Sequence, residues 1–176
     1  MTTKEKLLAL LEDSKGTFFS GEEIARTLQV SRAAVWKAVS ALREDGYTID
    51  AATNKGYRLS PDSDILSPQG IRRFLKPEYR DLDLTVLPTA PSTNALVREK
   101  ANQGRPEGCV IVACEQTDGR GRYGRQFFSP VDSGVYLSLL LRPTAYSPQQ
   151  ATCLTAAAAA AMCQAIEAVT GQQPGI

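Results

Sequence analysis

Apolar residues recur at helical spacing in three segments at the start of the chain. The first segment follows a capping-box pattern, Thr2 with Glu5, and predicts a helix that ends near Asp13. Ser20 and Ser31 precede the next two segments at the N-cap position, where a side-chain oxygen accepts a backbone N–H. Three short helices in this order predict a helix-turn-helix.

A strand-like hairpin follows the third predicted helix. Residues 47–52 and 57–59 are strand-like, and the turn-forming residues 53–56 lie between them. Helices followed by such a hairpin are typical of a winged helix-turn-helix, which we expect to occupy residues 1–60. The polar, proline-containing stretch 61–66 is typical of a linker.

Helical and strand-like segments alternate in the second domain, which we expect at residues 67–176. The predicted order is helix 68–75, strand 83–87, helix 92–102, strand 108–116, a polar loop, strand 134–142 and helix 148–169. The last helix contains an alanine run, whose small side chains favour the helix and allow close packing. The chain as a whole is therefore predicted to be of the α+β class.

The third predicted helix has an apolar and a polar face. At about 100° per residue, Val35, Val39 and Leu42 fall on the inner face. The opposite face and the wing carry the cations, hydroxyls and apolar surface that a major-groove reader requires. The expected DNA-binding residues are Ser31, Arg32, Ala33, Trp36, Lys37, Ser40 and Lys55. A protein-docking surface is the alternative, but cations on both the helix and the wing favour DNA.

Composition and charge narrow the possible functions. Twenty basic and nineteen acidic side chains give a net charge of +1, so DNA contact depends on where the cations lie. The chain has no histidine, which excludes Ser-His and Cys-His nucleophile pairs. Its four cysteines have no zinc-site spacing, so we expect no protein-bound metal. The charged N-terminus is typical of neither a signal peptide nor a membrane helix, and we expect a cytoplasmic protein without a membrane partner.

Candidate chemistry is concentrated in a loop that follows the strand ending at Gln116. The glycines and arginines of this loop are Gly119, Arg120, Gly121, Arg122, Gly124 and Arg125. Glycine lets the backbone approach a ligand closely, and guanidinium groups offer paired donors to phosphate oxygens. A dinucleotide-binding loop is excluded because strand-like sequence, rather than a helix, follows. The alternatives to a phosphorylated ligand are a flexible basic loop and a nucleic-acid contact.

A second polar cluster joins the predicted strand 83–87 to the next helix. Ser92, Thr93 and Asn94 stand at the start of that helix. Helix capping is one explanation for these residue types. The other is that their hydroxyl and amide groups face a ligand at the edge of the sheet, together with Gln116.

The Ser-Thr-Asn turn, Gln116 and the Gly-Arg-Gly-Arg-x-Gly-Arg loop together resemble the family of bifunctional biotin protein ligases and biotin operon repressors. The resemblance runs from the N-terminal helices, through Ser31–Ala34 and the wing residues Asn54–Tyr57, to Ile176. It implies a winged helix-turn-helix followed by the first part of a biotin/lipoate-ligase-type α/β catalytic domain with a mixed sheet. The residues it implies for biotin binding are Ser92, Thr93, Asn94, Gln116, Arg120, Gly121 and Arg122.

The resemblance also implies substrates and partners. The Gly-Arg loop is expected to enclose biotin and the activated phosphate, and Phe127 stands where the family often has tryptophan. The complete enzyme is expected to join biotin and ATP, with Mg²⁺ on the nucleotide, into biotinyl-5'-AMP and pyrophosphate. It then transfers biotin to a lysine of biotin carboxyl carrier protein. Ligand binding is expected to favour a homodimer that binds biotin operator DNA and represses biotin genes.

By the same resemblance, we expect an incomplete second domain. Family members continue with a Lys-Trp-x-Asn-Asp type strand, whereas no lysine follows Lys100 in this sequence. The lysine expected to contact the biotin carboxyl and the α-phosphate therefore lies beyond Ile176, and we expect a truncated chain without full ligase activity. The alternative is a winged-helix regulator whose second domain is degenerate, ligand-sensing or inactive.

Overall fold

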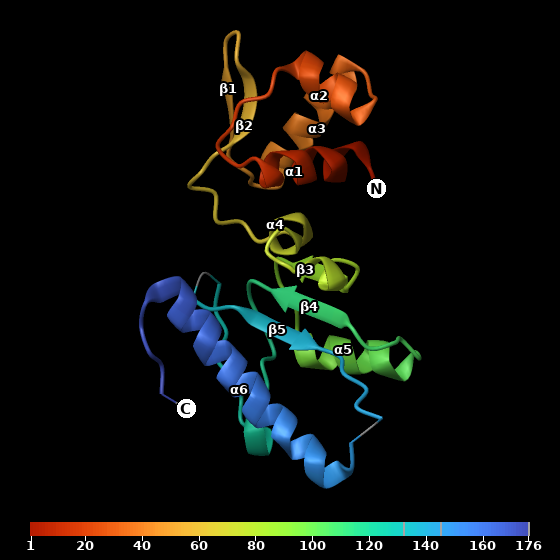
Figure 1. The fold of residues 1–176 in the computed structure, drawn as a ribbon, viewed down its shortest axis with the longest axis vertical. Coiled ribbons are helices and arrows are strands. Elements are labelled where there is room, and N and C mark those ends of the chain that lie inside the picture. Colours follow the sequence, from red (N-terminus) through yellow and green to blue (C-terminus); the bar gives the residue numbers. More distant parts are fainter. Residues whose placement is uncertain (132, 145, 176) are drawn as a thin grey trace.

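The N-terminal unit lies at one end of the molecule, and α4 (Pro68–Arg72) lies between it and the larger sheet (Figure 1). The computed structural model describes residues 1–131, 133–144 and 146–175. Within these ranges five side chains are outside the description, those of Arg122, Pro148, Gln149, Ala151 and Thr152.

Three helices and a hairpin form the N-terminal unit: α1 (Thr3–Asp13), α2 (Gly21–Leu28), α3 (Arg32–Glu44), β1 (Ile49–Ala52) and β2 (Gly56–Leu59). The side chains of Thr2, Ser20 and Ser31 cap the three helices, each accepting a backbone N–H three residues ahead. The Thr2–Glu5 capping box is complete. The predicted helix-turn-helix and hairpin are confirmed.

The core of this unit joins the helices to the hairpin. Leu7, Leu42 and Leu59 are fully buried in one cluster, which Ile49 completes from the opposite strand. Each such side chain contributes about 1.5–3 kcal/mol by its burial. The segment before α2 forms an isolated antiparallel bridge with β2, because the backbones of Phe19 and Tyr57 exchange hydrogen bonds of 2.9 and 2.8 Å. The wing is thereby fixed to the start of the helix-turn-helix.

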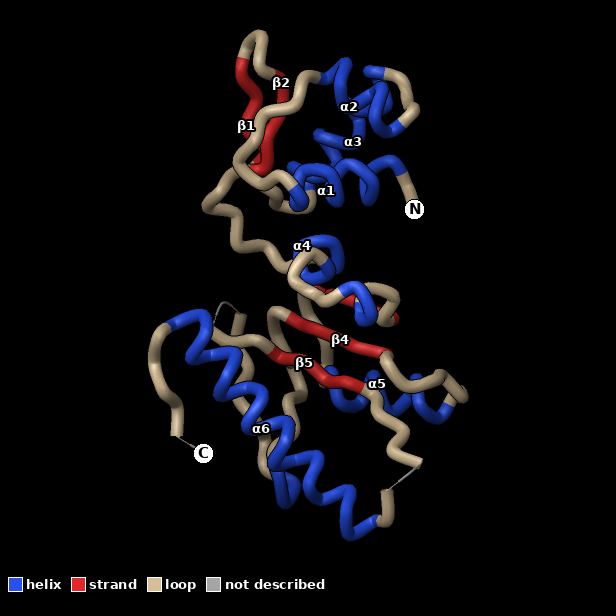
Figure 2. The backbone as a smooth tube through the Cα atoms, viewed as in Figure 1, coloured by secondary structure: helices blue, strands red, loops and turns tan. Residues whose placement is uncertain are grey.

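A mixed three-stranded sheet organises the second half of the chain. The remaining elements are a 3-10 helix, η1 (Pro77–Tyr79), β3 (Asp83–Leu87), α5 (Thr93–Asn102), β4 (Cys109–Ala113), a second 3-10 helix, η2 (Arg122–Gly124), β5 (Tyr136–Leu139) and α6 (Pro148–Thr170). The central strand β4 runs parallel to β3 and antiparallel to β5, and Figure 2 shows β4 and β5 side by side. Helix α5 packs on the sheet, where Val97 and Ile111 share a buried cluster.

The regular strands are shorter than the apolar pattern predicts. Sequence pattern predicts strands at 108–116 and 134–142, but the ladders cover only β4 and β5. The chain beyond β4 still pairs at one residue: Gln116 forms isolated bridges with Ala90 on one side and Ser129 on the other. The end of this extended segment is therefore held from both sides.

Helix α6 contributes little to the buried core, and most of its described side chains are exposed. Among the described residues, its segment Cys153–Thr170 is long and apolar enough to cross a membrane, with a mean hydropathy of 1.4. Length and composition alone are weak evidence for a membrane helix, because helices that pack within soluble domains share both properties.

A buried polar contact connects the two halves of the chain. Glu12 of α1 and Ser67, the N-cap of α4, are 5% and 1% exposed, and the Ser67 hydroxyl donates to the Glu12 carboxylate at 3.2 Å. The same hydroxyl accepts the Gly70 N–H at 2.8 Å. Burial raises the pKa of the adjacent Tyr47 phenol, although its hydrogen bond to Ser67 opposes the shift. The stretch 61–66 is also anchored, because Lys15 donates to a carbonyl within it.

Candidate functional site

The side chain of Gln116 is the centre of a polar cluster at the end of the sheet. Its Oε1 accepts the backbone N–H of Thr93 at 2.8 Å and the Thr93 hydroxyl at 3.1 Å. Its Nε2 donates to the Ser129 hydroxyl at 3.1 Å. The Thr93 hydroxyl also lies 3.0 Å from that of Ser138 in β5. One amide thus joins the start of α5 to the segment that returns from the Gly-Arg loop.

The Ser-Thr-Asn turn divides its side chains between the interior and the surface. Ser92 is 2% exposed and caps α5 by accepting the Ala95 N–H at 3.5 Å. Thr93 is 4% exposed and faces Gln116, whereas Asn94 is exposed. Helix capping therefore explains Ser92. The Thr93 hydroxyl faces Gln116 in the interior, and the Asn94 amide is at the surface.

The Gly-Arg loop is a hairpin. The Gly121 N–H donates to the Arg125 carbonyl and the Phe127 N–H donates to the Gly119 carbonyl, both at 2.7 Å. At its tip η2 contains two left-handed residues, Tyr123 with φ of 58° and Gly124 with φ of 72°. A side chain at Gly119 would overlap the Phe127 carbonyl oxygen, so glycine is required there to close the hairpin.

A cleft of about 720 Å³ separates this hairpin from the first turn of α5. Its lining residues are Ser92, Asn94, Ala95, Arg98, Asp118, Gly119, Arg120, Gly121, Gly124, Arg125 and Gln126. Three arginines and the N-terminus of a ten-residue helix give the cleft a positive character, despite Asp118. The guanidinium of Arg120 is paired with the Asp118 carboxylate at 3.1 Å, and both are exposed.

Gln116 lines a second cleft, of about 340 Å³, which shares Gln126 with the first. Phe127, Phe128 and Ser129 are among its other lining residues. Of the residues predicted to bind biotin, Ser92, Asn94, Arg120 and Gly121 line the first cleft, and Gln116 lines the second. Thr93 lines neither and acts through Gln116.

Two arginines fall outside the predicted binding residues whose side chains the structure describes. The side chain of Arg122 lies outside the described ones, so its predicted contact stays a prediction. Arg98 lines the first cleft and was missed from sequence. It lies four residues after Asn94 on α5, and this helical spacing is the signal that places both on one face. Among the described residues, no group of three or more histidine, cysteine, aspartate or glutamate side chains is placed to hold a metal ion.

Most of the predicted DNA-binding residues are exposed on α3 and at the wing turn. Trp36 is 61% exposed, and Ser31, Arg32, Ala33 and Lys37 are exposed with it, while Ser40 is partly buried. Arg32, Ala33 and Trp36 line a cleft of about 760 Å³ between α3 and the wing. Lys55 is exposed at the wing turn, between Asn54 and Gly56, which line this cleft.

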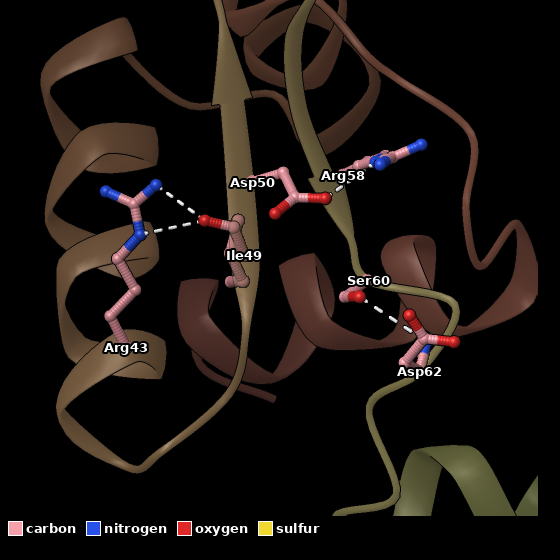
Figure 3. Close-up of polar contacts among 6 residues, drawn as sticks. All are labelled: Arg43, Ile49, Asp50, Arg58, Ser60 and Asp62. Carbon is pink, nitrogen blue, oxygen red and sulfur yellow. Dashed lines mark hydrogen bonds and ion pairs between the residues drawn. The ribbon is translucent and has the colours of Figure 1, made fainter.

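Two arginines hold the hairpin in place beside this cleft. Arg43, in the last turn of α3, donates from Nε and Nη2 to the Ile49 carbonyl of β1 at 3.1 and 2.6 Å (Figure 3). Arg58 of β2 donates to the Asp50 carboxylate of β1 at 2.8 Å. Helix α3 and the wing are therefore joined by side-chain hydrogen bonds.

Comparisons with known proteins agree with both halves of this description. Residues 3–58 match the HTH domain family, and residues 86–176 match the Biotin/lipoate A/B protein ligase family. The chain belongs to the biotin/lipoate A/B protein ligase family. The predicted fold class is thereby confirmed: a helix-turn-helix with a wing, followed by part of a ligase-type domain with a mixed sheet.

Several bifunctional ligase/repressors are similar to this ligase-family chain. The bifunctional ligase/repressor BirA of Bacillus subtilis (strain 168) is 40% identical over 175 residues, which are 99% of this chain and 54% of that protein. The BirA of Bacillus spizizenii gives the same identity and coverage. The BirA of Escherichia coli (strain K12) is 36% identical over 141 residues, 80% of this chain and 42% of that protein. The chain spans about half the length of the Bacillus relatives.

Two glycines of the ligase-family loop provide a matched test of the hairpin. Gly119→Ala should break the hairpin, because its Cβ meets the Phe127 carbonyl and lies 2.7 Å from the Ser129 hydroxyl. Gly124→Ala meets no atom within 4 Å and should cost only about 1–2 kcal/mol of left-handed strain. Amide hydrogen exchange at Phe127 is the measurement. We expect protection to be lost in Gly119→Ala and kept in Gly124→Ala; equal protection would show that Gly119 is not needed for closure.

Proposed function

We propose that this chain carries the DNA-binding domain and the biotin-facing part of a bifunctional biotin ligase and repressor. In this proposal residues 1–60 bind DNA, 61–66 are the linker, and 67–176 are the first part of the catalytic domain. The observation that carries the proposal is the Gln116 amide, which joins the start of α5 to the segment after the Gly-Arg hairpin, next to an arginine-lined cleft that shares Gln126 with its own. The similarity to bifunctional ligase/repressors supports it over the full chain.

The polar cluster suits the two ends of biotin. The ring system of biotin carries a cyclic urea, which needs hydrogen-bond donors and acceptors in a partly buried place. Gln116 and the Ser-Thr-Asn turn supply amide and hydroxyl groups of that kind. The carboxylate at the other end is anionic, and Arg98, Arg120 and Arg125 line the cleft through which it would extend.

In the proposed reaction a carboxylate oxygen of biotin attacks the α-phosphorus of ATP, and pyrophosphate leaves. The amine of a carrier-protein lysine then attacks the acyl carbon of biotinyl-5'-AMP, and AMP leaves. The described residues contribute binding, orientation and positive charge beside the phosphate. Magnesium would enter with the nucleotide. The chain spans about half the length of its Bacillus relatives, and the part of the proposal that its described residues support is ligand binding.

The proposed partners follow from the two units. In this proposal α3 and the wing bind biotin operator DNA, and the ligase part binds biotin carboxyl carrier protein. A second copy of the chain joins when ligand is bound, so that two recognition helices meet two half-sites. A cytoplasmic location, where DNA and ATP are both available, is part of the same proposal.

Ligand binding should slow cleavage of the Gly-Arg hairpin by trypsin. Arg120 and Arg125 are exposed residues of the hairpin. A ligand bound in the cleft would contact the hairpin and oppose the local opening that trypsin requires. With biotinyl-5'-AMP at ten times its Kd, cleavage after these residues should slow about tenfold, as mass action requires. Cleavage after Arg26 in α2, far from the cleft, serves as the control. Equal slowing at all three sites, or none at Arg120 and Arg125, would contradict the assignment.

Replacing cations of α3 should weaken DNA binding in a salt-dependent way. Arg32→Ala and Lys37→Ala should each lower the slope of log K against log salt by about 0.9 for every phosphate contact that is lost. Lys76→Ala, an exposed lysine outside the N-terminal unit, is the matched control. Fluorescence anisotropy of a labelled mixed-sequence duplex, titrated at about 50 to 200 mM salt, measures this slope. Unchanged slopes in both α3 variants would remove α3 from the interface.

A further inference from the structure

Phe18 is a half-buried aromatic residue between α1 and α2 that contacts the wing. Its neighbour Phe19 pairs with Tyr57 of β2 and packs against the N-terminal core. Successive residues of an extended segment point to opposite faces. The Phe18 ring consequently lies on the outer face of the wing, away from the core.

Two cations of the wing lie over the Phe18 ring. The guanidinium carbon of Arg58 is 4.7 Å from the ring centroid, and the ammonium nitrogen of Lys55 is 5.9 Å from it. Both distances are within the range of cation–π attraction. The ring is therefore shared by the cation at the wing turn and the cation of β2.

Arg58 is held from a second side. It lies opposite Asp50 in the hairpin register, and the two side chains form an ion pair at 2.8 Å on the same outer face (Figure 3). No described carboxylate pairs with Lys55. The Phe18 ring is thus the contact that the structure gives for the Lys55 ammonium, and Arg58, which Asp50 holds, lies over the same ring.

We propose that Phe18 is a positioning residue for DNA binding, whose ring holds the wing cations Lys55 and Arg58 toward the phosphate backbone. The inference rests on the proposed DNA-binding function and adds to it a residue outside both α3 and the wing. A lysine side chain has many rotamers, and fixing it in advance reduces the entropy lost on binding. The ring leaves the Lys55 ammonium its charge and its donors, whereas a carboxylate would compete with the phosphate. Arg58 donates to Asp50 from Nε, which leaves its terminal N–H groups for a phosphate.

The ring, rather than its apolar volume, should determine the affinity for DNA. Phe18→Leu should weaken binding of a mixed-sequence duplex about two- to fivefold, the range expected for an exposed cation–π contact. Phe18→Tyr, which keeps the ring, should bind as the parent chain does. Phe74→Leu is the matched control, because Phe74 also lies under an arginine, Arg73 at 5.1 Å, but outside the N-terminal unit. It should leave binding unchanged.

A double-mutant cycle separates positioning from a purely structural role. If Phe18 acts through the two cations, Phe18→Leu has no further effect in a chain that already carries Lys55→Ala and Arg58→Ala. An effect of the same size in that background overturns the proposal. Fluorinated phenylalanine at position 18 changes the charge of the ring face with little change in size, and affinity should fall with increasing fluorination. That series keeps the test decisive if Phe18→Leu does not fold.

The outcomes also separate this inference from the function on which it rests. If Arg32→Ala and Lys37→Ala weaken binding while the Phe18 variants and the double cation variant match the parent chain, the wing does not use these cations and only the inference is overturned. If all of these variants bind as the parent chain does, DNA binding by this surface fails, and the inference fails with it.

Discussion

The hydrogen bonds of the Gln116 side chain are the contacts on which the candidate site depends. The amide oxygen binds Thr93 at the start of α5, and the amide nitrogen binds Ser129 at the end of the Gly-Arg hairpin. Both partners are at most 4% exposed, so a lost hydrogen bond would leave a buried polar group unsatisfied, at a cost of about 1–3 kcal/mol. These hydrogen bonds therefore limit the distance between α5 and the Gly-Arg hairpin, which line the two sides of the first cleft.

A buried, hydrogen-bonded pair of polar groups also connects the N-terminal unit to the second half of the chain. The Glu12 carboxylate lies at the junction and is satisfied by the Ser67 hydroxyl, which also starts α4. Because a lone buried carboxylate is costly, the contact favours one placement of α4 against α1. This junction and the anchored stretch 61–66 therefore join α1 to α4 by side-chain contacts as well as by the backbone.

Local signals were sufficient for the helices and insufficient for the contacts between elements. Thr2, Ser20 and Ser31 could be recognised as caps because a cap and its partner lie three residues apart. The strand predicted at 108–116 is longer than β4, because a strand ends where its neighbours stop pairing, and the sequence of 108–116 alone does not show where β3 and β5 lie. Contacts such as Gln116 with Thr93 depend on which strands pair, and the pairing of Arg120 with Asp118 depends on the loop conformation. Neither follows from spacing.

The central claim is that the cluster around Gln116 binds the biotin part of the ligand, and calorimetric titration with biotinyl-5'-AMP tests it most directly. Gln116→Met removes both hydrogen-bonding ends of the side chain and keeps its approximate size. Thr89→Val, which removes an exposed hydroxyl that donates to Glu115, is the matched control. The account predicts saturable binding that weakens about tenfold or more in Gln116→Met, the equivalent of about 1.4 kcal/mol, and stays unchanged in Thr89→Val. Equal affinity in the parent chain and Gln116→Met, or no saturable binding to the parent chain, would contradict it.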